Sequence, residues 1–267
     1  MVEMMRRLKM NNKLYTMCGT VALAFVACSE NSGVGGTSVE PNTVYAEDNW
    51  LWNPLAGDLS VNTARYTALL PEKVNADGHW FWNVEERETD NDEGGLSSII
   101  WPVELGGGVD PLSTVIESCN GICGVADLSK GSLNYQPYVS VGFVIARDSA
   151  GKPTPVDVSD WGGVCITYAS EISPRLVLDL GDSLRSIFDD GASFPEVNLA
   201  KTPNEISKCF SWDKFKIPSW RSRPPESWKN ETGWKASKQL VGLMFVIQGN
   251  PGQYAFSIKY VGTAGGV

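Results

Sequence analysis

Apolar and polar residues alternate along much of this chain from residue 79 onward. In the stretch 139–145, apolar residues recur at every second position, at Val141, Phe143 and Ile145, so these three lie on one side of an extended chain. This period is typical of a β-strand that buries one face. The same pattern predicts strands at 163–168, 175–180, 242–247 and 254–261, with further strands at 79–84, 97–103 and 206–212.

Turn-forming dipeptides separate these strands, among them Gly-Gly, Asp-Gly, Pro-Pro and Asn-Pro. Only 234–240 carries a helical pattern, and it is short. Many short strands without alternating helices favour a sandwich or jelly roll over a parallel sheet. We therefore expect an all-β sandwich with one short helix, built as a single domain over 45–267.

The first residues have a different pattern. Four basic residues within the first thirteen positions precede an apolar run, 14–27, that ends directly before Cys28. This arrangement resembles a bacterial lipoprotein signal, which implies that 1–27 is removed and that Cys28 carries the lipid. A single membrane span is the alternative, but it needs about 20 apolar residues.

The segment 28–44 is rich in Gly, Ser, Thr and Asn and has no periodicity, so it is interpreted as a flexible tether. Together these features predict a protein of the cell envelope, attached to the outer membrane or the cell surface through its lipid alone.

The charge of the chain narrows the range of partners. It has 22 basic and 31 acidic residues, and its net charge is −9. An acidic protein repels phosphate backbones, so we expect no nucleic-acid partner. A neutral polysaccharide is compatible with this charge and stays a candidate partner.

Six cysteines are present. Two of them are not available for disulfides in the mature protein, Cys18 in the leader and Cys28, the lipidation candidate. The remaining four are Cys119, Cys123, Cys165 and Cys209. An even number in an oxidising compartment indicates disulfides, whereas zinc binding is disfavoured by export and by the lack of a nearby histidine. Four cysteines allow three pairings. The short turn 120–122 would let Cys119 and Cys123 reach each other.

A family resemblance rests on four segments, 159–168, 176–180, 210–215 and 243–248. Their order resembles that of family 11 carbohydrate-binding modules and their galactose-binding-like jelly-roll relatives, over about 45–262. The arrangement also looks like exported, often lipid-anchored proteins of plant-fibre-degrading bacteria. If the jelly-roll order holds, Cys165 and Cys209 lie on neighbouring strands and form a second disulfide.

Aromatic side chains are the first candidates for binding a sugar, because their flat faces suit the apolar face of a pyranose. Ten tryptophans are present. Trp80 and Trp82 are two residues apart on a predicted strand, so they share a face. Tryptophans of a sandwich are also common in the core, to which we assign Trp161 and Trp212.

A second group of candidates lies in the Pro-rich segment 218–233, which we expect to be an exposed loop. It contains Trp220, Arg221, Arg223 and Trp228. The equivalent loop of family 11 modules supplies ligand contacts, so the resemblance implies the same role here.

An acidic turn offers hard oxygen ligands at Asp90, Asp92 and Glu93, which are the type that calcium prefers. A structural calcium and a solvated acidic turn are the two interpretations, and the full twelve-residue calcium loop is absent. No other cofactor is indicated.

Catalysis has little support in the sequence. The only histidine is His79, and neither a Gly-x-Ser-x-Gly elbow nor a nucleotide-binding motif is present. A glycosidase needs only two carboxylates, so a hydrolase or lyase stays an alternative. We expect non-catalytic binding of a β-glucan-like plant polysaccharide. The other alternative is a structural or adhesion lipoprotein.

Overall fold

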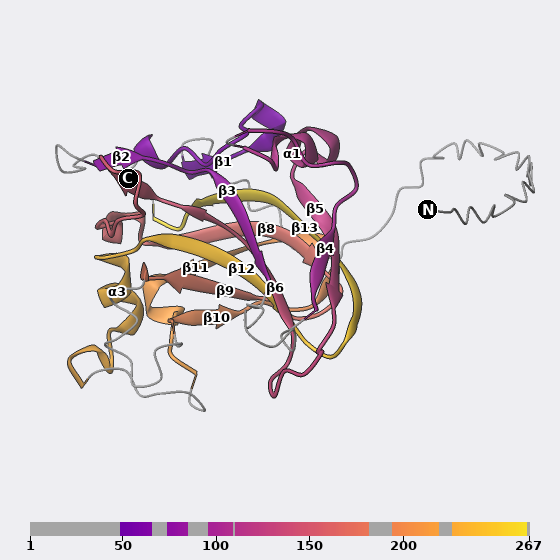
Figure 1. Cartoon of the computed structure of the whole chain (residues 1–267). Helices are drawn as coiled ribbons and strands as arrows, with labels where there is room; N and C mark the ends of the chain where they lie inside the picture. Colours follow the sequence, from indigo (N-terminus) through magenta and orange to yellow (C-terminus); the bar gives the residue numbers. More distant parts are fainter. Residues whose placement is uncertain are drawn as a thin grey trace, which may run out of the picture. The chain divides into compact units, whose positions relative to one another are not determined.

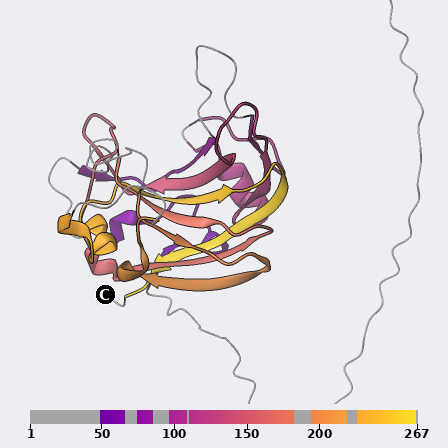
Figure 2. The ribbon, with the colours of Figure 1, turned by 90° about the horizontal axis from the view of Figure 1, so that it is seen from below.

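Two antiparallel sheets face each other in the computed structural model, which describes residues 49–65, 74–84, 96–108, 110–181, 194–218 and 226–265. The predicted leader, Cys28 and tether lie outside these residues. By their contacts, residues 44–267 form one unit. The views in Figure 1 and Figure 2 show the two sheets as separate layers.

The larger sheet has the strand order β11-β8-β13-β5-β4, and β1 also pairs with β13. Its strands are β1 (Trp50–Trp52), β4 (Ser98–Ile100), β5 (Ile122–Leu128), β8 (Gly163–Ser170), β11 (Thr202–Ser211) and β13 (Gly252–Thr263).

The five-stranded sheet has the order β10-β9-β12-β6-β3. Its strands are β3 (Trp80–Val84), β6 (Tyr138–Val144), β9 (Arg175–Asp179), β10 (Glu196–Asn198) and β12 (Gly242–Gln248). A separate two-stranded sheet joins β2 (Val74–Ala76) to β7 (Ala146–Asp148).

The order of the strands identifies the topology as a jelly roll. Eight strands form two sets of four, β5-β13-β8-β11 in one sheet and β6-β12-β9-β10 in the other. Along these eight strands the chain changes sheet at every step except from β9 to β10. Two interlocked Greek keys give this pattern, so the predicted all-β jelly roll is confirmed.

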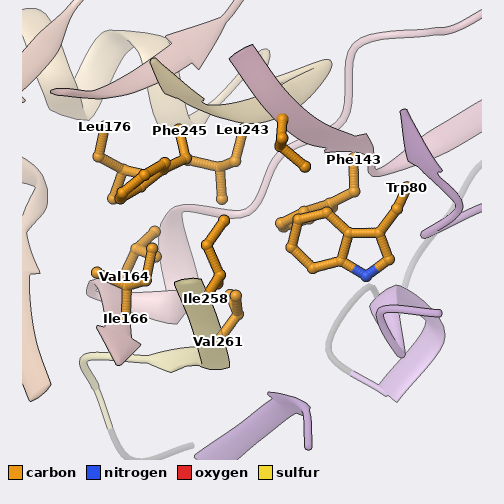
Figure 3. A pocket seen from close by; sticks show the side chains of 10 residues that line it. Trp80, Phe143, Val164, Ile166, Leu176, Leu243, Phe245, Ile258 and Val261 are labelled. Carbon is orange, nitrogen blue, oxygen red and sulfur yellow. The ribbon is translucent and has the colours of Figure 1, made fainter. Parts of the chain in front are cut away.

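The core forms where the inward faces of both sheets meet, because alternate residues of each strand point inward. Val141, Phe143 and Phe245 of one sheet face Ile166 and Ile258 of the other, as Figure 3 shows for the labelled side chains. These side chains leave a cavity of only ≈ 10 Å³. Trp161 and Trp212 are fully buried, as predicted.

Several elements were not predicted. The helix α1 (Ser113–Cys119) was not expected, and the strands β1, β2, β5, β7 and β10 occupy stretches for which no strand was predicted. The predicted helix at 234–240 is present as α3 (Thr232–Ser237), which begins two residues earlier.

Both predicted disulfides are formed. Cys119 at the end of α1 is bonded to Cys123 in β5, with their Cα atoms 6.1 Å apart. Cys165 is bonded to Cys209, and the two residues lie directly opposite each other on β8 and β11. The zinc alternative is therefore wrong, because the four sulfur atoms are paired with one another.

Candidate functional site

One face of the five-stranded sheet points away from the core. Trp80, Phe143 and Leu243 point into the sandwich, so by strand alternation their neighbours point outward. We call the outward side of this sheet the outer face. Its side chains belong to Phe81 and Asn83 of β3, Tyr138, Ser140, Gly142 and Val144 of β6, Arg175, Val177 and Asp179 of β9, Glu196 and Asn198 of β10, and Met244, Val246 and Gln248 of β12.

Strand pairing aligns these side chains in rows across the sheet. One row contains Phe81, Gly142, Met244, Val177 and Glu196 in this order. Side chains directly opposite each other on neighbouring strands lie in contact distance, so the row runs from an aromatic edge to a carboxylate.

The next row contains Asn83, Ser140, Val246, Arg175 and Asn198, again in spatial order. Four of these five residues are polar, and Asn83 and Asn198, at the two ends of the row, are exposed. Ser140 and Val246, in the middle of the row, are only 2% and 6% exposed, so the accessible amide groups of the row are those at its two ends.

The apolar centre of the outer face depends on a glycine. A Cβ atom on Gly142 would lie 3.1 Å from Phe81 Cζ and 3.1 Å from Met244 Cγ. The missing side chain therefore leaves room for Phe81 and Met244 to approach each other over β6. Phe81 is half-buried, so part of its ring stays open to solvent.

The polar part of the outer face is a connected hydrogen-bond network. Arg175 Nη1 forms an ion pair with the Glu196 carboxylate, and Arg175 Nη2 donates to Gln248 Oε1 at 2.8 Å. Gln248 Nε2 in turn donates to the backbone oxygen of Gln136 at 2.8 Å. These bonds fix which end of the Gln248 amide donates and which accepts.

The outer face thus combines an aromatic ring with polar groups held in place by their neighbours. Such a surface can stack against the apolar side of a sugar ring while hydrogen-bonding its hydroxyl groups. Gln248 and Tyr138 lie opposite each other on β12 and β6, and both are half-buried. They extend the polar part toward one end of the sheet.

Two predicted platforms are buried and cannot present a face to a sugar. Trp80 is 5% exposed and packs edge-on against Trp52 and Phe143, because it points to the inner side of β3. Trp228 is 8% exposed at the end of a short 3₁₀ turn, η6 (Glu226–Trp228). Neither tryptophan therefore has the exposed face that its predicted role requires.

Trp82 shares the inward side of β3 with Trp80, as predicted, but lies near the end of the strand. It is half-buried and contacts Trp101 edge-on, with the ring centres 6.0 Å apart. This pair covers the core between β3 and the residues that follow β4, so Trp82 does not lie on the outer face.

The other predicted site residues lie outside the described part of the chain. They are Trp220, Arg221 and Arg223 of the Pro-rich segment and Asp90, Asp92 and Glu93 of the acidic turn. Among the residues that the structure describes, no group of three or more His, Cys, Asp or Glu side chains could hold a metal ion.

The residues of the outer face were missed because each looks unremarkable in the sequence. Arg175 and Gln248 are 73 positions apart, and only the pairing of β9 with β12 brings them together. The available signal was the strand alternation itself, which assigns the neighbours of each core residue to the opposite face.

No family model matches the chain, and no curated protein matches it. Among solved structures, it is similar to the family 11 carbohydrate-binding module of a cellulosomal cellulase from Clostridium thermocellum. The identity is 11%, the match covers 74% of this chain and 96% of that one, and the TM-score is 0.42.

Two further solved structures are similar. One is a family 11 module from Clostridium thermocellum in complex with a β-1,3-1,4-mixed-linked tetrasaccharide, at 10% identity, 73% and 96% coverage and a TM-score of 0.42. The other is a family 29 carbohydrate-binding module, at 9% identity, 70% and 94% coverage and a TM-score of 0.29. These three neighbours are carbohydrate-binding modules, and an agarase is also similar in structure, at 14% identity, 75% and 24% coverage and a TM-score of 0.31.

Proposed function

We propose that this protein binds a plant cell-wall polysaccharide, without cleaving it, on the outer face of its five-stranded sheet. The observation that carries the proposal is the combination of Phe81 and Met244 with the fixed network of Arg175, Glu196 and Gln248 on one surface. Mixed-linkage β-glucan is the first ligand to test, because the sequence resembles family 11 modules.

The proposed anchor at Cys28 would make such binding effective even when each contact is weak. Several copies held on one membrane can engage the same polymer, and linked binding sites gain avidity without any new contact. The proposal therefore requires only modest affinity from each domain.

The test is isothermal titration of β-glucan oligosaccharides into the purified full chain, compared with Phe81→Ala and Gln248→Ala. An aromatic contact contributes about 0.5–1.5 kcal/mol beyond the buried area, so we expect Phe81→Ala to bind about 3- to 10-fold more weakly. A hydrogen bond contributes a similar net energy of about 0.5–1.5 kcal/mol, so Gln248→Ala should weaken binding to the same degree. Circular dichroism would confirm that both variants are folded.

Trp234→Ala is the matched control, because Trp234 is an exposed aromatic residue on α3 and not on the outer face. It should bind like the wild type. Equal binding by folded Phe81→Ala, Gln248→Ala and wild type would show that the ligand lies elsewhere, and Trp220→Ala would then test the Pro-rich segment. If the wild type binds no polysaccharide on a glycan array, the structural envelope protein becomes the better explanation.

A further inference from the structure

The charges on the outer face cancel one another. Among the described residues, Arg175 and Lys216 are the cations at this face, and Glu196 and Asp179 are the anions. Lys216 is placed at the rim because its backbone pairs with that of Glu196, and paired residues point to the same side.

Arg175 is the cation nearest the centre of the face, and its charge is compensated at close range. Its side chain is only 15% exposed, and that of its partner Glu196 is 9% exposed. A planar guanidinium is well suited to hold a carboxylate, but here a carboxylate of the chain already occupies one of its nitrogen atoms. A second nitrogen atom is bonded to Gln248.

A polysaccharide with carboxylate groups would therefore meet an unfavourable surface. To pair with Arg175 it would have to displace Glu196. The largely buried charge of Glu196 would then lack its partner, and such a loss is costly. The net charge of −9 on the whole chain adds repulsion at longer range.

We propose that Glu196 determines specificity, so that the outer face selects neutral polysaccharides and rejects those that contain uronic acids. This inference rests on the proposed function. It assigns Glu196 an exclusion role, in which an interaction within the protein makes binding of the wrong ligand unfavourable.

The experiment compares two polymers, mixed-linkage β-glucan and polygalacturonate, with the full-length wild type and Glu196→Gln. The wild type should bind the first polymer and not the second. Glu196→Gln keeps an acceptor for Arg175 but removes the negative charge, so its affinity for polygalacturonate should rise about tenfold or more. Salt at about 0.5 M should reduce this gain, because it screens the long-range attraction between the charges, although a partly buried pair is screened less.

Glu205→Gln is the matched control, since it removes one negative charge from β11 of the other sheet. It should gain no affinity for polygalacturonate. The double variant Arg175→Gln, Glu196→Gln should lose the gain, which would show that it acts through Arg175.

The binding results distinguish a role of Glu196 from a failure of the proposed function. If the wild type binds β-glucan and folded Glu196→Gln gains nothing, Glu196 has no such role, while the proposed function stands. Equal binding of both polymers by the wild type overturns the inference without any variant. If the wild type binds neither polymer, the proposed function and the specificity role of Glu196 are both wrong.

Discussion

At the scale of single residues, Gly142 is where the outer face is packed most tightly. A Cβ atom there would collide with the backbone oxygen of Leu243, besides meeting Phe81 and Met244. We expect Gly142→Ala to lower the free energy of unfolding by about 1–3 kcal/mol, as overpacking commonly does. Urea unfolding would measure this change.

Gly107→Ala is the control for this prediction, because a Cβ atom on Gly107 would have nothing within 4 Å. It should change the free energy of unfolding by no more than about 0.5 kcal/mol. If the two variants are equally stable, the close approach of Phe81 and Met244 over β6 is not a constraint on the sheet.

Asp213 is a residue for which the structure predicts a pH effect in the acidic range. The pKa of its carboxyl group is lowered from the ordinary value of 3.8, mainly by the hydrogen bond from Ser211 and further by Lys214. A carboxyl group with a lower pKa in the folded state stabilises the fold above its unfolded pKa. This contribution is lost as the pH falls through the folded pKa.

The measurement for Asp213 is a titration of its carboxyl carbon by NMR. Ser211→Ala should move the pKa upward toward 3.8, because it removes the largest cause of the shift. Lys214→Met should give a smaller change in the same direction. An unchanged pKa in Ser211→Ala would mean that the hydroxyl group does not bond to Asp213 in solution.

At the scale of elements, alternation was a reliable guide where one face of a strand is buried. The core strands β6, β8, β9, β12 and β13 all overlap their predicted ranges. The helix α1 was missed because its sequence, STVIESC, contains β-branched residues that lower helix propensity.

The candidate site was harder to predict than the strands. A pattern within one strand tells which side chains share a face, but not which strand lies beside it. The Arg175–Gln248 hydrogen bond depends on the register of β9 against β12, which tertiary packing sets. The buried Trp228 was misassigned for a related reason, since a polar Pro-rich neighbourhood does not reveal what packs on it.

The two disulfides should stabilise the fold to different degrees. Cys165–Cys209 closes a loop with a sequence separation of 44, and Cys119–Cys123 one with a separation of 4. Loop entropy predicts losses of about 4 and about 2 kcal/mol when each is replaced by a pair of alanines. Urea unfolding of the two double variants checks the order, and a larger loss without Cys119–Cys123 would contradict the entropic account.

At the scale of the whole molecule, the proposed attachment to a membrane is through a lipid on Cys28. The proposal rests on the basic leader and the apolar run that ends at Cys28. None of the helices in the described part of the chain is long and apolar enough to cross a membrane. If the protein is attached in this way, several copies on one surface gain avidity for the same polymer. Each outer face then needs only modest affinity.

Cys28→Ala is the variant that tests the attachment. Without the thiol there is no acceptor for the lipid, so labelling of the protein with a clickable fatty acid should be abolished. The protein should also leave the membrane fraction, because one or more acyl chains supply the membrane affinity. Cys18→Ala is the control, because Cys18 lies in the predicted signal segment that is removed from the mature protein. This variant should label like the wild type. Undiminished labelling of Cys28→Ala would refute lipidation at this residue and, with it, the proposed envelope location.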